Sequence, residues 1–78
     1  MKLEYNKSFG GYVKSLRKKR GFTQVDLAEK IDNNFQNISS LERDKFGPSL
    51  NYLYKLAKAF DMSIVQFIQG FEDFNSNQ

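Results

Sequence analysis

Apolar residues recur at helical spacing along most of the chain and predict five short helices. In the first, Phe9, Val13 and Leu16 follow one another at intervals of four and three residues, which places them on one face of a helix. This helix is expected over residues 8–20, with Gly21 as its stop signal. No stretch alternates apolar and polar residues as a strand does, so the predicted fold class is all-α, a compact five-helix bundle.

The second and third helices are short, and a tight turn separates them. Thr23 is a typical N-cap residue for the second helix. The inner stripe of that helix is expected to be Leu27, Ala28 and Ile31. Asp32-Asn33-Asn34 is a turn signature, because Asp and Asn tolerate a left-handed backbone and bond to nearby backbone groups. Asn34 can cap the third helix, in which only Ile38 and Leu41 point clearly inward.

Two further helices complete the predicted bundle. The fourth opens at Gly47-Pro48-Ser49, and the fifth opens at Ser63, which can form a capping box with Gln66. The apolar stripe of the fourth is Leu50, Leu53, Tyr54, Leu56, Ala57 and Phe60. The fifth is expected over about residues 63–72, and the polar, Asn-rich residues 73–78 are expected to fray.

The composition restricts the chemistry open to the chain. Its 78 residues are enough for a single domain, residues 1–78. There is no Cys and no His, so disulfides, thiolate metal sites and the commonest acid–base group are missing. We therefore expect no enzyme activity, no cofactor and no metal. No apolar signal region or membrane-length apolar run is present, which predicts a cytoplasmic protein without a membrane partner.

Charge is unevenly distributed along the chain. Residues 1–20 carry seven basic side chains and one acidic side chain, 7 − 1 = +6. Residues 21–60 carry five of each sign, and residues 61–78 carry three acids and no base, giving −3. A basic end on a chain with an isoelectric point of 9.3 indicates an anionic partner, most commonly nucleic acid. Lysine-rich helix faces are also often merely solvated, so charge alone does not decide.

The spacing of the second and third helices gives the functional signal. Two short helices meet at a three-residue turn, and the second of them has few apolar residues. This is the helix-turn-helix arrangement, in which the second helix presents a polar face to the major groove of DNA.

Several sets of residues, in register, resemble a known family. They are Gly21-Phe22-Thr23-Gln24 with Leu27-Ala28 and Ile31, then Ile38-Ser39-Ser40-Leu41-Glu42-Arg43, and then Pro48-Ser49-Leu50 with Leu53 and Leu56-Ala57-Lys58-Ala59-Phe60. Over about residues 9–68 the chain resembles the Cro/cI-type (Xre-type) helix-turn-helix family of bacterial and phage transcription regulators. The resemblance implies a lambda-repressor-like DNA-binding domain with its helix-turn-helix at about residues 23–43.

The resemblance also implies which residues read bases. Gln36 and Ser40 match base-reading positions of the family, and a Gln amide suits adenine. Phe35 stands where the family is usually polar, so it either contacts a thymine methyl group or packs on the protein. Asn37 lies on the flank and could contact a base or a phosphate. Asn34 either caps the helix or contacts a base.

Phosphate contacts are implied at the edges of the same motif. Gln24 matches the backbone-clamping Gln of the family, at a helix start where free N–H groups favour an anion. The full set is Thr23, Gln24, Arg43, Lys45 and Asn51. Arg17 and Glu42 match a structural ion pair, for which we expect an exposed pair contributing about 0–1 kcal/mol. Asp32 and Asn33 depart from the Gly and apolar residue of the family, which predicts a turn that is either looser or differently shaped.

The last predicted helix has more apolar residues than the flank of a small bundle covers, which predicts a homodimer interface. The interface residues are expected to be Val65, Phe67, Ile68 and Phe71. The alternative is that Phe67 and Ile68 close the core of the monomer, with Phe71 and Phe74 in a disordered tail.

The expected function is sequence-specific regulation of transcription. A homodimer would bind a palindromic operator in double-stranded DNA, with the third helix of each copy in the major groove. The alternatives are an antitoxin, which would bind a toxin or other partner protein and autoregulate its operon, and a protein adaptor that shares the fold without binding DNA.

Overall fold

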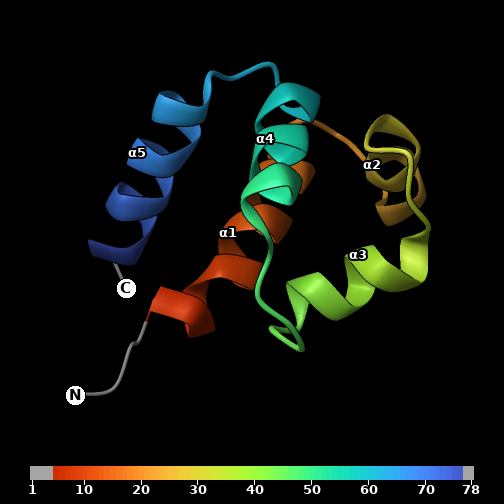
Figure 1. The fold of residues 1–78 in the computed structure, drawn as a ribbon, viewed down its shortest axis with the longest axis horizontal. Helices are drawn as coiled ribbons and strands as arrows, with labels where there is room; N and C mark the ends of the chain where they lie inside the picture. Colours follow the sequence, from red (N-terminus) through yellow and green to blue (C-terminus); the bar gives the residue numbers. More distant parts are fainter. Residues whose placement is uncertain (1–4, 77–78) are drawn as a thin grey trace.

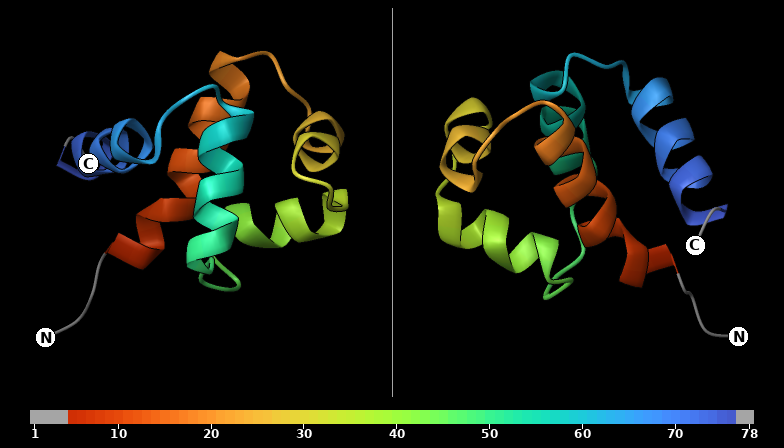
Figure 2. Two further views of the ribbon diagram at one scale, coloured as in Figure 1. Left: turned by 45° about the horizontal axis from the view of Figure 1, so that its top comes forward. Right: turned by 180° about the vertical axis from the view of Figure 1, so that it is seen from behind.

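The protein consists of five α-helices joined by short loops, in a computed structural model that describes residues 5–76 and the side chains from residue 9 onward. The helices are α1 (Tyr5–Lys19), α2 (Gln24–Lys30), α3 (Phe35–Glu42), α4 (Leu50–Ala59) and α5 (Ile64–Ser76). α1 runs through the middle of the bundle, with α3 against one side and α5 against the other (Figure 1). α4 lies alongside α1 in every view (Figures 1 and 2). Residues 5–76 contain no strand, and the predicted all-α class is confirmed.

One hydrophobic core joins all five helices. Its buried members are Phe9, Tyr12, Val13, Leu27, Ala28, Ile31, Ile38, Leu41, Leu56, Ala57, Phe60 and Phe67. The rings of Phe60 and Phe67 stack with their centroids 6.3 Å apart and join the end of α4 to α5. The predicted inner stripes of α2 and α3 are confirmed, because all their members belong to this core.

The predicted capping residues begin the helices. The Oγ1 of Thr23 accepts from the Asp26 N–H, while the Asp26 carboxylate accepts from the Thr23 N–H, so the two residues form a capping box. The caps of the later helices are Asn34, Ser49 and Ser63. Gln66 completes the second predicted capping box by accepting from the Ser63 N–H at 2.9 Å.

Four helices end in the same left-handed turn, which satisfies their last carbonyl groups. At the end of α4, for example, the N–H of Met62 donates to the Ala57 carbonyl and that of Asp61 to the Lys58 carbonyl, both at 2.9 Å. The residues with positive φ at these ends are Gly21, Asp32, Asp44 and Asp61. Only Gly adopts this conformation without steric strain, so three of the four turns carry a strained Asp.

The end of α5 differs from the prediction. Residues 73–76, which we expected to fray, are helical, because α5 continues to Ser76. The ring of Phe74 packs against that of Tyr12 with 5.7 Å between centroids, and this contact holds the last turns on α1. Residues 77–78 lie outside the described part of the chain.

The inward face of α4 is also narrower than predicted. Leu50 and Tyr54 are 68% and 52% exposed. Leu56, Ala57 and Phe60 set the buried face in the last turns of the helix, so Leu50 in its first turn and Tyr54 on its flank remain outside the core.

Tyr12 fixes the position of α5 on α1. Its buried hydroxyl donates to the Phe67 carbonyl at 2.6 Å. Gly70 makes this approach possible, because a Cβ at residue 70 would collide with the Tyr12 hydroxyl. Burial, together with the negative charge of Asp73, raises the pKa of Tyr12 to about 12, so the hydroxyl keeps its proton and remains a donor at any ordinary pH.

The strained helix ends predict a stabilising substitution. Asp61→Gly should raise the free energy of unfolding by about 0.5–1 kcal/mol, because Gly adopts the positive φ of 60° without strain and an acidic group leaves a helix C-terminus. Urea denaturation followed by circular dichroism measures the change.

Asp44→Gly is the matched control. Asp44 has nearly the same φ, 57°, but its carboxylate accepts from the Gly10 N–H at 2.9 Å. The relief of strain and the loss of this bond should therefore offset each other. Equal stabilisation by both substitutions would contradict the role assigned to the Asp44 carboxylate.

Candidate nucleic-acid interface

α2 and α3 form the predicted helix-turn-helix, and they cross at a steep angle (Figure 2). Ile38, Leu41 and Glu42 point into the protein. At 100° per residue, Gln36 and Ser40 therefore lie on the opposite, outward face of α3. Gln36 is exposed and Ser40 is half-buried.

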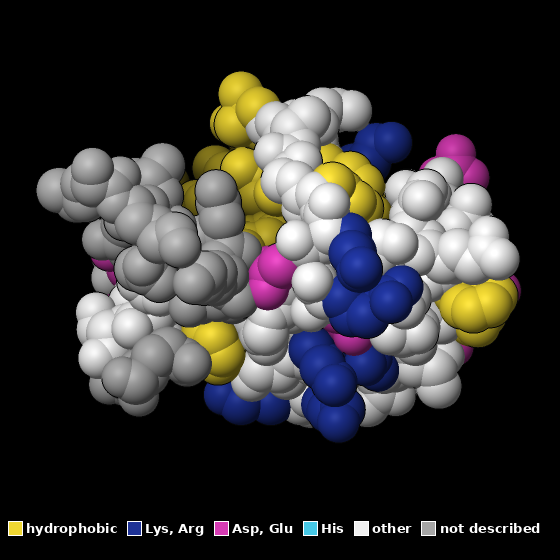
Figure 3. All heavy atoms as spheres, turned by 90° about the horizontal axis from the view of Figure 1, so that it is seen from below, with side chains coloured by type: hydrophobic (Ala, Val, Ile, Leu, Met, Phe, Trp, Pro, Cys, Tyr) yellow, Lys and Arg dark blue, Asp and Glu magenta, His cyan; other side chains and the backbone are white. Residues whose placement is uncertain are grey.

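The face of the molecule that carries α3 is basic near its middle. Seen from below, Lys and Arg side chains gather there beside acidic groups (Figure 3). Arg43 and Lys45, which follow α3 directly, are both exposed. Arg43 Nε donates to the Ser39 carbonyl at 3.3 Å, so part of its guanidinium remains free for another acceptor. Asn51, in the first turn of α4, is exposed as well.

A buried ion pair joins α1 to the end of α3. Arg17 Nε lies 2.6 Å from Glu42 Oε2, and Arg17 Nη2 lies 3.1 Å from Glu42 Oε1. A third guanidinium bond, from Nη1, reaches the carbonyl of Phe22 at 2.9 Å. The predicted pairing is present, but the expected exposure is wrong: the two residues are 8% and 9% exposed, because α1 and α3 close over them.

Gln24 is attached to this ion pair. Its Nε2 donates to Glu42 Oε1 at 3.1 Å, so the side chain is held across the start of α2. An amide nitrogen carries two hydrogens, and one of them remains for a ligand. Thr23 is exposed beside it, but its side chain is engaged in the capping box, which also lowers the pKa of Asp26 through the hydrogen bond from the Thr23 backbone N–H.

The turn before α3 is held by three Asn side chains. Asn34 Oδ1 accepts from the Asn37 N–H at 2.9 Å, so Asn34 is the N-cap, one of its two expected roles. Asn33 Oδ1 accepts from the Asn34 N–H and from Asn37 Nδ2. The turn is therefore closed by polar bonds, which fits the second of the two expectations, a differently shaped turn rather than a looser one. Phe35 leaves 51% of its surface exposed beside it.

Sequence reasoning assigned no role to two residues that place α3, Gly10 and Asp44. A Cβ at Gly10 would lie 2.5 Å from the Glu42 carbonyl oxygen and 2.6 Å from that of Leu41, so only Gly lets α1 approach the end of α3. Asp44 then accepts from the Gly10 N–H. The Gly-rich start of the first helix was the available signal, and it did not indicate the partner.

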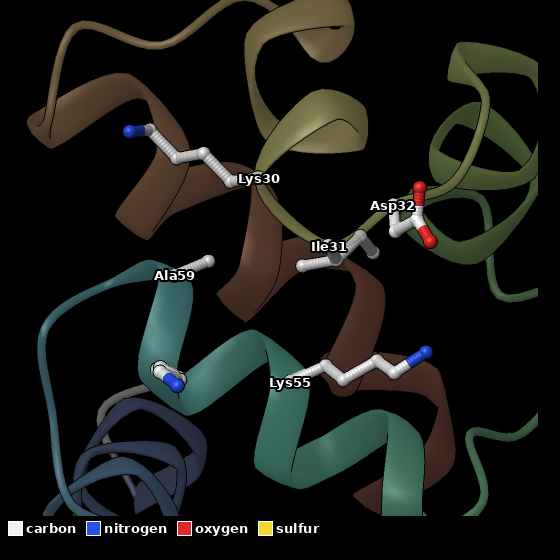
Figure 4. Close-up of a pocket in the computed structure, with 6 residues that line it drawn as sticks. Lys30, Ile31, Asp32, Lys55 and Ala59 are labelled. Atoms are coloured by element: carbon white, nitrogen blue, oxygen red, sulfur yellow. The ribbon is translucent and has the colours of Figure 1, made fainter.

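The cleft between α2 and α4 does not have the character of a ligand site. It is lined by Lys30, Ile31, Asp32, Lys55, Lys58 and Ala59 (Figure 4). Lys30 and Lys55 point away from each other, and the Lys30 ammonium lies over the Phe22 ring, 4.7 Å from its centroid. A small-molecule site needs polar groups that converge.

Residues 5–76 contain neither a candidate metal site nor a candidate membrane-spanning helix. That part of the chain has no group of three or more acidic, His or Cys side chains able to hold a metal ion. Nor does it include a helix with the length and apolar character that crossing a membrane demands.

Comparison with known proteins identifies the class. The helix-turn-helix family model matches residues 13–67. The chain belongs to this family, the Cro/cI or Xre type of DNA-binding transcription regulator, which is not a family of enzymes.

Individual relatives are repressors and regulators. The immunity repressor of Bacillus phage phi105 is 38% identical over 55 residues, which cover 70% of this chain and 38% of the repressor. The transcriptional regulator ImmR of Bacillus subtilis is 38% identical over 56 residues, covering 72% of this chain and 44% of that protein. The chain thus spans less than half the length of these two relatives.

Solved structures share the fold. The restriction-modification controller protein C.Esp1396I superposes with a TM-score of 0.86 at 23% identity, covering 99% of this chain and 100% of that one. The controller C.AhdI of Aeromonas hydrophila gives a TM-score of 0.75 at 27% identity, covering 82% and 96%.

Burial of the ion pair changes the expected energetics. Glu42→Ala should lower the free energy of unfolding by about 3 kcal/mol or more, because it leaves the Arg17 guanidinium buried without its partner. Glu29→Ala, an exposed site on α2, should change it by less than about 0.5 kcal/mol. Urea denaturation compares the two variants. If Glu42→Ala lowered the free energy of unfolding by less than about 1 kcal/mol, the pair would contribute no more than an exposed ion pair does.

Proposed function

We propose that the protein binds a palindromic DNA operator as a homodimer and regulates transcription, with α3 of each copy in the major groove. The observation that carries the proposal is the outward face of α3. Gln36 is exposed on it and Asn37 is exposed on its flank. The apolar side chains of α3 that belong to the core, Ile38 and Leu41, turn away from it. An α-helix with such a face fits the width of the major groove.

Phosphate contacts would set the register of α3 without reading sequence. Gln24 is the best-prepared donor, because Glu42 holds its amide in place and one amide hydrogen remains for a phosphate oxygen. Lys45 and Arg43 would contact the backbone beside α3, with Thr23 and Asn51 at the edges of the interface. The −3 charge of residues 61–78 keeps α5 away from DNA.

Base contacts would come from the first turns of α3. The Gln36 amide makes no side-chain hydrogen bond with another described residue, so both its donor and its acceptor are available for an adenine edge. The exposed ring of Phe35 would contact a thymine methyl group. Ser40, one turn after Gln36, would read a neighbouring base, and Asn34 would contribute less because its oxygen caps α3.

Pairing of two copies would use the outer face of α5. Val65 is 73% exposed and Ile68 is 37% exposed. Phe67 does not suit the role predicted for it, because it is fully buried in the monomer. Phe71 is only partly buried, but its ring lies 5.5 Å from that of Phe9 and 5.6 Å from that of Tyr12, which leaves less of it available for pairing. The interface proposed is therefore centred on Val65 and Ile68.

Two substitutions should separate base reading from phosphate binding. Gln36→Ala should cost about 1–3 kcal/mol on the operator and relax the choice of one base pair per half-site. Lys45→Ala should weaken binding to all DNA sequences alike. It should also make the slope of log K against log salt concentration shallower, by about 0.9 for each phosphate that the protein no longer neutralises. Fluorescence anisotropy on a selected operator and a scrambled duplex measures both.

Each variant is the control for the other. Gln36→Ala should leave the salt dependence of binding unchanged, and Lys45→Ala should leave the preference among base pairs unchanged. If both variants fold and bind operator as the wild type does, α3 and its following loop are not the DNA interface.

Val65→Asp should give a folded monomer with much weaker binding to a palindromic operator. The charge would enter the proposed interface, while a side chain that is 73% exposed in the monomer adds little to its stability. One copy reads only one of two half-sites, about 34–36 Å apart. Sedimentation measures the mass of the variant, and fluorescence anisotropy measures its affinity for the operator.

Asn75→Asp, farther along α5, is the charge-matched control. A wild-type protein that sediments as a monomer at tens of micromolar, yet binds the operator fully, would exclude the dimer.

A further inference from the structure

Asn33 joins the turn of the helix-turn-helix to the first turn of α3. Its Oδ1 accepts from the Asn34 N–H at 2.8 Å and from Asn37 Nδ2 at 2.6 Å. Its own Nδ2 lies 3.5 Å from the hydroxyl of Tyr52 on α4. Tyr52 packs against the core, so this chain of bonds runs from the core to an exposed side chain on α3.

The backbone fixes the orientation of both amides. The N–H of Asn34 can only donate, so the atom of Asn33 that it meets must be the oxygen. That oxygen also meets the Asn37 amide, which must therefore present its nitrogen to it. The Asn37 side chain is thus held in one of its two amide orientations before any ligand binds.

The held orientation leaves a defined pair of groups on Asn37. One hydrogen of Nδ2 is engaged with Asn33, so the second hydrogen and Oδ1 remain. A free donor and a free acceptor on one amide match the N7 acceptor and the N6 donor of adenine in the major groove. Asn37 is exposed in the first turn of α3, the part of a recognition helix that contacts base edges.

We propose that Asn33 is a positioning residue that presents Asn37 to an adenine, which makes Asn37 a specificity-determining residue of the operator. The proposal rests on the proposed DNA-binding function. It assigns to Asn37 a contact with a base rather than with a phosphate. It also gives a reason for a polar residue at position 33 of the turn, because an apolar side chain there could not hold the amide of Asn37.

The test is a base-by-base selectivity profile. The wild-type protein first selects a duplex from a random library, and affinities are then measured for every single-base variant of it. Asn37→Ala should abolish the preference for adenine at one position per half-site, a loss of about 10-fold or more. Asn33→Ala should reduce the preference at that same position, and the double variant should lose no more than Asn37→Ala alone.

Two conservative variants separate positioning from folding. Asn33→Asp keeps an oxygen for Asn34 and Asn37 and should retain the adenine preference, even if its charge weakens all DNA alike. Tyr52→Phe removes only the hydroxyl and should retain most of the adenine preference. In the free wild-type protein, NMR should show slower exchange of the Asn37 side-chain amide hydrogens than of those of exposed Gln36.

The outcomes are distinguishable. Failure to select any duplex overturns the proposed function, and this inference with it. If a duplex is selected but Asn33→Ala keeps the full preference, or if Asn37→Ala weakens all duplexes equally, the inference fails and the DNA-binding function stands. Equal exchange of the Asn37 and Gln36 amides would overturn the held orientation even if Asn33→Ala did not fold.

Discussion

The buried ion pair between Arg17 and Glu42 is the interaction on which the position of α3 depends. It joins α1 to the last residue of α3, and it reaches the loop before α2 through the Phe22 carbonyl. Charges withdrawn from water destabilise a fold unless every donor and acceptor is engaged. Here Gln24 takes up a further bond to Glu42, and no buried side-chain nitrogen or oxygen in the described part of the chain lacks a partner. The pair therefore orients four segments at once.

α3 is held at both ends and left open between them. At its C-terminal end, Gly10 lets the α1 backbone come close, and Asp44 bonds to the Gly10 N–H. At its N-terminal end, Asn33 engages both the backbone of Asn34 and the side chain of Asn37. In the proposed function, a recognition helix with fixed ends would lose little further freedom on binding, and such preorganisation improves affinity without added contacts.

Local signals explain why so much of the fold is readable from sequence. The start of α2 after Thr23 and the turn that begins at Asp32 depend on residues within one helical turn, so capping and turn chemistry identify them. Burial of Arg17 and Phe67 depends instead on which distant helix covers them. The bond from Asn33 to Asn37 is local in sequence, but an Asn in a turn has too many possible partners for the pattern to choose one.

α1 links the two surfaces that the proposed function requires. Arg17 of α1 faces the end of α3. Tyr12, five residues before Arg17 on α1, bonds to α5. If two copies pair through Val65 and Ile68, the separation of their α3 helices is then fixed by one continuous helix and the contacts at its two sides. A bundle of this size has a small core, and stability is usually its weakest property. The five-ring contact of Phe9, Tyr12, Phe67, Phe71 and Phe74 therefore stabilises the monomer. In the proposed dimer it would also keep the half-site spacing constant.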